Sequence, residues 1–255
     1  MSTPLKVWLE AEGSLLRLRL NRPKANLIDA QMIAALDRAI AEHVANPGTS
    51  AVLLDAEGPH FSFGASVEEH RPKQCAAMLR SLHGLILGML ESTVPILVAV
   101  NGQCLGGGLE LALAGHLLFV APDAVLGQPE MKLGVFAPAA SCLLPELIGP
   151  QRSFDLLISG RNITGSRASE IGLALQSAAD PVAAALAYFN ESIQSKSTSS
   201  LRHAVRAARF DYASRVRNKL AAVERLYVEE LMTTHDAVEG IESFIAKRAA
   251  QWMHR

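Results

Sequence analysis

Three consecutive glycines stand between a strand pattern and a helix pattern in residues 101–115, NGQCLGGGLELALAG. Such a run costs backbone entropy, so it is expected where the chain turns sharply or another group approaches the backbone closely. Free amide groups and the positive end of a helix dipole favour an anion or a developing oxyanion at this turn. Glu110 follows in the first helical turn. Taken alone, the segment fits equally well an ordinary turn in which Glu110 complements the dipole.

The spacing of these glycines argues against two common phosphate-binding motifs. GxxxGGG lacks the GxGxxG spacing of dinucleotide-binding turns, and no GK[ST] follows as in a P-loop. The 24 Lys and Arg against 25 Asp and Glu leave a net charge of −1, which gives no positive field for a nucleic-acid partner. With 49% hydrophobic and 19% charged residues, the composition is that of a globular chain.

The cysteines and the apolar stretches indicate the compartment. Cys75, Cys104 and Cys142 lie far apart and form no CxxC pair, so we expect neither a disulfide framework nor a metal site. The N-terminal residues do not read as a secretory signal, and the longest apolar stretches fall well short of the ~20 residues that span a bilayer. We therefore expect a cytoplasmic protein without a membrane contact.

Strand patterns alternate with helix patterns through the first 190 residues, which predicts an α/β architecture. Residues 15–20 alternate apolar and basic side chains, as in a strand with one solvent-exposed face, and Asp29 is placed to cap the helix that follows. Further strands are expected at 51–54, 96–100 and 117–121, and helices at 72–91 and 109–115. Several connections are too short for regular crossovers, so periodicity leaves the topology open.

The composition changes near residue 191, where a polar stretch of linker type leads into a region of helices without strands. We accordingly divide the chain into a core at 1–195 and a C-terminal helical region at 196–255. The apolar face of that region, which includes Val223, Leu226, Tyr227 and Leu231, must pack on its own core or on a neighbouring subunit.

Two further segments carry residues suited to chemistry. In FSFGAS, residues 61–66, the pair Gly64-Ala65 can expose a backbone amide, although a plain turn is the simpler interpretation of this loop alone. In LGQPEMKLGV, residues 126–135, Glu130 would usually be a solvated loop residue. It gains importance if it reaches the pocket of Glu110, because two carboxyl groups together supply acid and base chemistry.

In order and spacing, these three segments resemble the crotonase, or enoyl-CoA hydratase/isomerase, superfamily. LNRPKAN at 20–26 and THDAVEGIESFIAKR at 234–248 extend the resemblance over nearly the whole chain. The resemblance implies a spiral of ββα units with a C-terminal helical region that helps to build trimers or dimers of trimers. It also implies an acyl-CoA thioester substrate, and no cofactor apart from the coenzyme A of that substrate.

The resemblance also assigns site residues. It places the oxyanion hole at the backbone N–H groups of Ala65 and Gly107, where two donors stabilise negative charge on a thioester oxygen. Glu110 and Glu130 match the two glutamates of the hydratases, which hold a water between them; which is acid and which is base stays open. Substrate contacts are expected at Lys24, Ala25, Phe63, Ser66, Val67, Gly106, Phe136, Ala137 and Pro138. Arg202, Arg206 and Arg209 form a basic helix face, either solvated or turned to the phosphates of coenzyme A.

The sequence departs from the family pattern at two places. Ser66 stands where most relatives have Asp, and residues 134–149, GVFAPAASCLLPELIG, replace a Gly-rich run and reshape the acyl pocket. This variant resembles the alicyclic dienoyl-CoA hydratases, so we expect hydration of cyclohexa-1,5-diene-1-carbonyl-CoA in anaerobic benzoyl-CoA degradation. The alternatives are a general short-chain enoyl-CoA hydratase, a double-bond isomerase, and a non-catalytic acyl-CoA-binding subunit, which the two departures favour.

Overall fold

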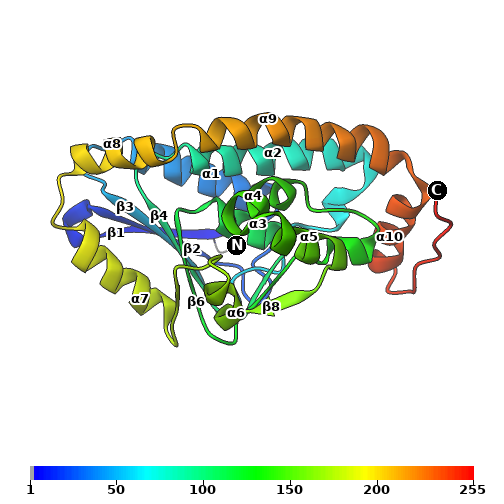
Figure 1. Cartoon of the computed structure of the whole chain (residues 1–255), viewed down its shortest axis with the longest axis horizontal. Helices are drawn as coiled ribbons and strands as arrows, with labels where there is room; N and C mark the ends of the chain where they lie inside the picture. The colour runs from blue at the N-terminus through cyan, green and yellow to red at the C-terminus, as the bar shows by residue number, and fades with distance from the viewer. Residues whose placement is uncertain (1–2) are drawn as a thin grey trace.

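A six-stranded sheet runs through the computed structural model, which describes residues 3–255 (Figure 1). Its strand order is β1-β2-β3-β4-β6-β9; β1 is antiparallel to β2, and all later neighbours are parallel. The strands are β1 (Leu5–Glu10), β2 (Leu15–Leu20), β3 (Ala51–Ala56), β4 (Ile96–Val100), β6 (Leu117–Val120) and β9 (Gln176–Ser177). Because each strand is added beside the preceding one, the chain winds in one direction.

A second sheet explains the short connections seen in the sequence. It has the order β5-β7-β8, with β5 (Gln103–Leu105), β7 (Val125–Gly127) and β8 (Asn162–Thr164). A bridge between Ser62 and Cys104 adds the loop after β3 to its edge. Successive turns therefore leave the first sheet and enter the second after only a few residues, as in the β4 to β5 step. This is the spiral of ββα units that the resemblance implies.

The first three helices of the spiral correspond to predicted helices, and the later ones were not predicted. They are α1 (Ala30–Val44), α2 (Pro72–Leu90), α3 (Gly107–Ala114), α4 (Pro138–Ile148), α5 (Pro150–Ser159), α6 (Gly165–Glu170) and α7 (Pro181–Tyr188). The predicted cap of α1 is confirmed, because an Asp29 carboxylate oxygen accepts from the Met32 N–H at 2.9 Å. Helix α3 begins at Gly107, two residues earlier than expected, so the glycine run itself forms its first turn.

The predicted solvent-exposed face of β2 is wrong. Arg17 is only 3% exposed, because its guanidinium donates to Asp55 on the neighbouring strand β3 at 2.8 Å. Arg19 donates to the same carboxylate at 2.6 Å. A buried charge is tolerated where it is paired and hydrogen-bonded, and this cluster provides both. The alternating basic residues of β2 thus mark a buried ion cluster.

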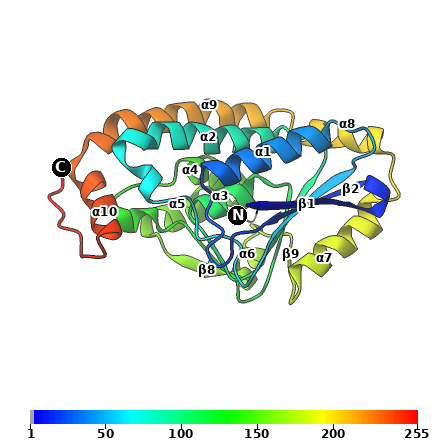
Figure 2. The ribbon, with the colours of Figure 1, turned by 180° about the vertical axis from the view of Figure 1, so that it is seen from behind.

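The C-terminal helices cover the spiral. They are α8 (Thr198–Ala208), α9 (Tyr212–Arg225) and α10 (His235–Ile245). Helix α9 lies beside α2 from both sides of the molecule (Figures 1 and 2). Val216 and Leu220 of α9 are buried in the main hydrophobic core together with residues of the six-stranded sheet. In residues 3–255, no helix is both long enough and apolar enough to span a bilayer.

Candidate active site

The glycine run brings α3 against two other segments of the chain. A Cβ atom at Gly107 would lie 3.1 Å from the Ala65 nitrogen, and one at Gly108 would lie 2.6 Å from the Cβ of Ser62. A Cβ at Gly106 would come within 2.7 Å of Glu130 Oε1. Each glycine therefore stands where a side chain would collide with a neighbour. The expected close approach to this turn is confirmed.

Two backbone amides are free at this contact. The N–H of Gly107 is the first of α3, so no helical carbonyl reaches it, and the N–H of Ala65 follows Gly64 in the neighbouring loop. Among residues 3–255, neither amide donates a hydrogen bond to a protein oxygen. Both residues line one cavity, so the structure brings the two predicted donors to the same space.

Glu110 faces this cavity from the first turn of α3. The residue is 3% exposed, and its carboxylate accepts a hydrogen bond from the Ala140 N–H at 2.8 Å. Burial raises the pKa of Glu110, while the N–H groups of Ala140 and Ala139 and the charge of His83 oppose the rise. Since Ala139 and Ala140 begin α4, the N-terminus of a second helix holds this carboxylate.

Glu130 reaches the same cavity from the 3₁₀ turn η3 (Pro129–Leu133). Its side chain is half-buried, and burial together with the negative charge of Glu110 raises its pKa to about 8. With its amide oriented to donate, the nitrogen of buried Gln128 lies 3.1 Å from each Glu130 oxygen. Gln128 was not predicted as a site residue, although it stands two positions before Glu130 in the same 126–135 segment.

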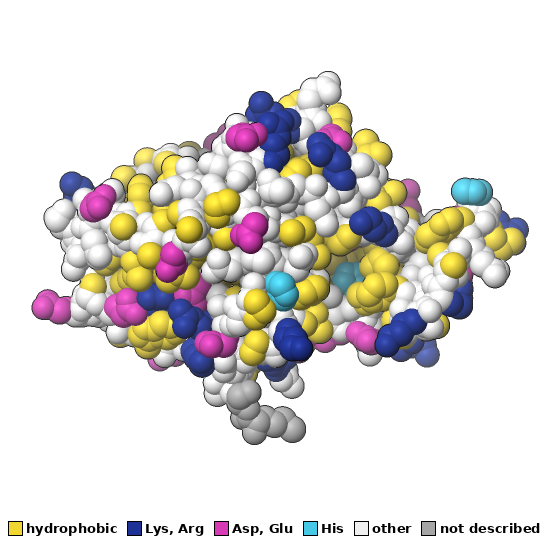
Figure 3. Space-filling model, turned by 90° about the horizontal axis from the view of Figure 1, so that it is seen from below, with side chains coloured by type: hydrophobic (Ala, Val, Ile, Leu, Met, Phe, Trp, Pro, Cys, Tyr) yellow, Lys and Arg dark blue, Asp and Glu magenta, His cyan; other side chains and the backbone are white. Residues whose placement is uncertain are grey.

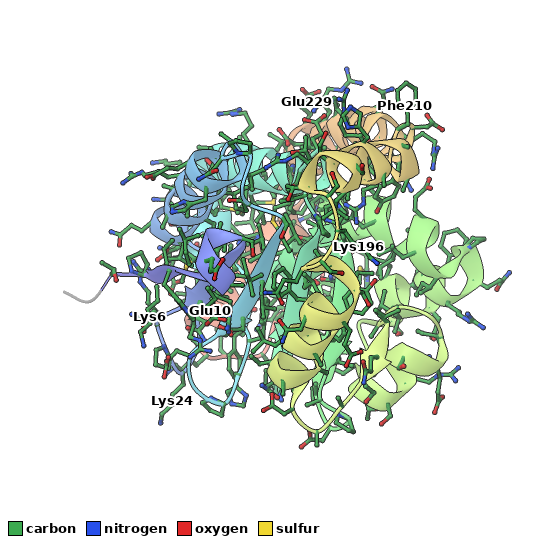
Figure 4. The ribbon with its side chains drawn as sticks, turned by 90° about the vertical axis from the view of Figure 1, so that its left-hand side faces the viewer. Lys6, Glu10, Lys24, Lys196, Phe210 and Glu229 are labelled. Atoms are coloured by element: carbon green, nitrogen blue, oxygen red, sulfur yellow. The ribbon has the colours of Figure 1, made fainter. Side chains whose placement is uncertain are left out.

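Only some of the predicted substrate contacts line the cavity. Those that do so, beside the two glutamates, are Phe63, Val67, Gly106, Phe136 and Pro138. Lys24, Ala25, Ser66 and Ala137 lie outside its lining. Of these, Lys24 is exposed and points away from the body of the protein (Figure 4).

Other lining residues were not predicted. Leu79 and Leu82 of α2 and Ile241 of α10 come from helices distant along the chain. Leu133 and Val135 lie within the 126–135 segment and His70 follows the 61–66 segment, but nothing in the sequence marked them as pocket residues. The ring of Phe136 meets that of Tyr227 edge-on at 5.2 Å, which closes the apolar side of the cavity. Most of the lining is therefore apolar, with the polar groups gathered at the glycine turn.

His70 is the one histidine in that lining. Its Nδ1 lies 2.8 Å from the Ser66 carbonyl oxygen, which can only accept, so Nδ1 carries the proton. Burial lowers the pKa of His70, so the ring is neutral near pH 7. In residues 3–255, no cluster of three or more His, Cys, Asp and Glu side chains could hold a metal ion.

The basic face of α8 has a structural role at two of its three positions. Arg202 donates to the carbonyl of Val44, the last residue of α1, and to those of Asn46 and Thr49 just beyond it. Arg209 donates at 2.6 Å to the Gly115 carbonyl at the end of α3. The solvated interpretation is therefore wrong for Arg202 and Arg209, which satisfy carbonyls at helix C-termini, whereas Arg206 is exposed.

Comparison with known proteins places this site in context. The family model described as Enoyl-CoA hydratase/isomerase matches residues 10–255. The chain is 64% identical over 254 residues to the cyclohexa-1,5-dienecarbonyl-CoA hydratase of Thauera aromatica, covering 100% of this chain and 98% of that protein. It is 32% identical to a probable enoyl-CoA hydratase of Mycobacterium leprae, covering 93% and 94%.

A solved structure agrees with these relatives. The crystal structure of an enoyl-CoA hydratase/isomerase from Pseudoalteromonas atlantica superposes with a TM-score of 0.84 at 26% identity. The superposition covers 98% of this chain and 99% of that one. The likeness thus includes the spiral and the C-terminal helices together.

Proposed function

Because the chain belongs to the enoyl-CoA hydratase/isomerase family, we propose that it adds water across a double bond conjugated to an acyl-CoA thioester, as a carbon–oxygen lyase. One observation carries the proposal. Two carboxyl groups, Glu110 and Glu130, and two free amides, those of Ala65 and Gly107, line a single cavity. A non-catalytic binding subunit has no need of two carboxyl groups with raised pKa values in one cavity.

The two amides supply the oxyanion hole. In the proposed complex the thioester oxygen accepts hydrogen bonds from the Ala65 and Gly107 N–H groups. As water adds to the conjugated carbon, negative charge moves onto that oxygen, and the two fixed donors stabilise it. One such donor is worth roughly 10²- to 10³-fold in rate. The absence of side chains at Gly106 and Gly107 leaves room for the carbonyl.

The surroundings of the two glutamates support different roles for them. Burial raises the pKa of Glu110, but the Ala140 N–H bond and the charge of His83 oppose this rise, so Glu110 is assigned as the base. Glu130, with a pKa of about 8, keeps its proton at neutral pH and is assigned as the acid. Glu110 takes a proton from the attacking water, and Glu130 protonates the carbon next to the thioester carbonyl. Transfer of one proton from Glu110 to Glu130 then restores the starting state.

The proposed substrate is cyclohexa-1,5-diene-1-carbonyl-CoA, an intermediate of anaerobic benzoyl-CoA degradation. Full-length identity of 64% to the Thauera aromatica hydratase supports this choice. So does the apolar wall of Phe136 and Pro138, which suits a flat and compact acyl group. The test is the ratio of kcat/KM for this thioester to that for crotonyl-CoA. A preference for crotonyl-CoA would instead indicate a general short-chain hydratase.

The acid and base roles of the two glutamates are tested with the variants Glu110→Gln and Glu130→Gln. Each variant is expected to fold normally and to lose roughly 10²- to 10⁴-fold in kcat, as for general acid and base groups. Incorporation of ¹⁸O from water into the product distinguishes hydration from double-bond isomerisation. Near-parental rates in both variants would contradict the mechanism, and calorimetric binding of the thioester without turnover would indicate a binding subunit.

In this proposal, coenzyme A is present only as part of the substrate. We further propose that the protein is cytoplasmic. Its proposed assembly is a homotrimer or a dimer of trimers. Apolar side chains on α5, with Phe154 55% and Ile158 70% exposed, support self-association. Acidic and basic side chains are interspersed on the face in Figure 3, in keeping with the absence of a nucleic-acid partner. Light scattering of the purified protein measures the assembly.

A further inference from the structure

The chain turns back after α10 and lies along that helix. Residues 249–255, here called the return segment, form the red trace beside α10 (Figures 1 and 2). Asp236, in the first turn of α10, accepts hydrogen bonds from the Met253 N–H at 2.7 Å and the His254 N–H at 2.8 Å. Its own N–H donates to the Arg255 carbonyl at 3.2 Å. The first turn of α10 therefore holds the return segment by its backbone.

Glu239 provides a second anchor further along α10. Its Oε1 accepts a hydrogen bond from the Gln251 N–H at 2.8 Å, and its Oε2 accepts one from Arg248 Nη2 at 2.7 Å. These bonds lower the pKa of Glu239 to about 2, with the bond from Arg248 as the largest cause. Because the amides of Gln251 and Met253 are both fixed, the residue between them, Trp252, is held on either side.

The indole of Trp252 packs where α10 meets the end of η3. Its Cζ3 and Cη2 atoms lie 3.0 and 3.3 Å from a Cβ built at Gly134, and Cη2 lies 3.1 Å from a Cβ built at Gly240. Gly134 ends η3 with φ +70°, and Gly240 lies within α10. A side chain at either glycine would press on the ring. The indole therefore packs closely on the backbone of both elements.

The two elements also approach each other directly beneath this ring. A Cβ at Gly240 would lie only 2.0 Å from the Leu133 carbonyl oxygen, and one at Gly134 would lie 2.8 Å from the Asp236 carbonyl oxygen. Glycine permits such a close approach of two backbones. Trp252 itself is 42% exposed, so its ring covers the contact from the solvent side.

This contact forms one wall of the active-site cavity. Residues on both sides of Gly134, and one beside Gly240, line the cavity: Leu133, Val135, Phe136 and Ile241. Tyr227 supports the Phe136 ring edge-on at 5.2 Å. Gly134 has no side chain with which to pack, so the indole supplies the packing at this point of the wall.

We propose that Trp252 is a positioning residue that fixes this wall and thereby determines which acyl groups the cavity accepts. The inference rests on the proposed function, because it takes the cavity as the acyl site. Without the indole, the turn at Gly134 loses its outer support and can move away from α10. The apolar wall then no longer matches a compact ring. Trp252 acts through this wall, since it does not itself line the cavity.

The experiment compares Trp252→Ala and Trp252→Phe with a matched control, Met253→Ala. Met253 is a large apolar residue of the same segment and is 49% exposed. It holds Asp236 through its main-chain N–H, which alanine keeps. Phenylalanine keeps an aromatic ring but is too short to reproduce the full contact of the indole, so Trp252→Phe is expected to lie between the parent and Trp252→Ala.

The binding readout is calorimetry with two thioesters that cannot be hydrated, cyclohexanecarbonyl-CoA and acetyl-CoA. In Trp252→Ala, the Kd for cyclohexanecarbonyl-CoA is expected to rise by roughly 10-fold, as for the loss of a few contacts in an apolar pocket. The Kd for acetyl-CoA, which has almost no acyl group to enclose, should stay at the parental value. Met253→Ala should keep both values. Equal changes for the two thioesters, or no change in either, would overturn the proposal.

The kinetic readout is the ratio of kcat/KM for the cyclic dienoyl thioester to that for crotonyl-CoA, measured well below the unfolding temperature of each variant. This ratio is expected to fall by roughly 10-fold in Trp252→Ala. A purely structural residue would lower Tm and leave the ratio unchanged, which would contradict the proposal. If the parental protein hydrates neither thioester, the proposed function is wrong, while the calorimetric comparison still decides the role of Trp252. Trp252→Phe decides the matter if Trp252→Ala does not fold.

Discussion

Oε1 of Glu130 occupies the space that a side chain at Gly106 would need, 2.7 Å from the position of its Cβ. Gly106 also has φ +51° and ψ −130°, a conformation that residues with a Cβ rarely adopt. The proposed acid therefore rests directly on the backbone that precedes α3. Gly106 thus contacts Glu130 and directly precedes Gly107, the proposed oxyanion-hole donor.

Gly106→Ala is expected to displace Glu130 and to lower kcat by roughly 10²-fold, because a 1 Å misplacement of a catalytic group has effects of this size. Steady-state kinetics measures this loss of kcat. The matched control is Gly172→Ala, where φ is +81° but nothing lies within 4 Å of the new Cβ. That variant is expected to lose about 1 kcal/mol of unfolding free energy to backbone strain and to keep its activity. Parental kcat in Gly106→Ala would contradict the assignment of Glu130.

Glu130→Gln is expected to be more stable than the parental protein at pH 8. The pKa of Glu130 is raised from 4.5 to about 8 in the folded chain, so the folded state binds its proton more tightly than the unfolded state. The loss of folding stability caused by this carboxyl is absent below about pH 4.5, and it grows as the pH rises to about 8. The gain in Tm of Glu130→Gln over the parent should therefore increase across this window. A gain independent of pH would argue against the raised pKa.

Phe136→Ala is expected to weaken the preference for the cyclic thioester. The ring lines the cavity and packs edge-on against Tyr227, so its loss opens the apolar wall. Pocket contacts of this kind discriminate by roughly 10- to 200-fold, and the ratio of kcat/KM values for cyclic and crotonyl thioesters should fall accordingly. Phe210→Ala, on the 87%-exposed Phe210 after α8, is the control and should keep the parental ratio. An unchanged ratio in Phe136→Ala would show that this side chain does not determine the preference for the cyclic thioester.

Arg202→Ala is expected to destabilise the fold by about 2 to 3 kcal/mol, because its guanidinium satisfies three carbonyls at the end of α1 and the Thr93 hydroxyl. Denaturant unfolding measures this loss, and kcat should not change. Exposed Arg206, one turn further along α8, is the matched control, and Arg206→Ala should unfold at the parental midpoint. Equal stability of the two variants would show that the cap contributes nothing.

Local patterns were enough to predict strands β2, β3, β4 and β6 and helices α1 to α3, because periodicity and capping depend on neighbouring residues. The helix after Asp29 and the turn at Gly106 are examples. The two edge strands β1 and β9 and the later helices were not predicted. The second sheet had no such signal, because β5, β7 and β8 have three residues each. A three-residue strand is too short to show a period.

Pairings between distant residues could not be predicted. Arg17 meets Asp55 38 positions away, and His83 meets Glu224 141 positions away. The Ala140 N–H that holds Glu110 comes from the loop-to-helix step that departs from the family pattern. The family resemblance identified the residues that are proposed to react. Their protonation states depend on neighbouring groups that come close only in the folded chain.

The position of α9 has a consequence for biosynthesis. Val216 and Leu220 complete the core that the sheet strands begin, and Glu224 on the same helix holds His83. Until α9 has left the ribosome, the nascent spiral exposes apolar surface and His83 lacks its hydrogen-bond acceptor. The core of the spiral can therefore be completed only after α9 has been synthesised.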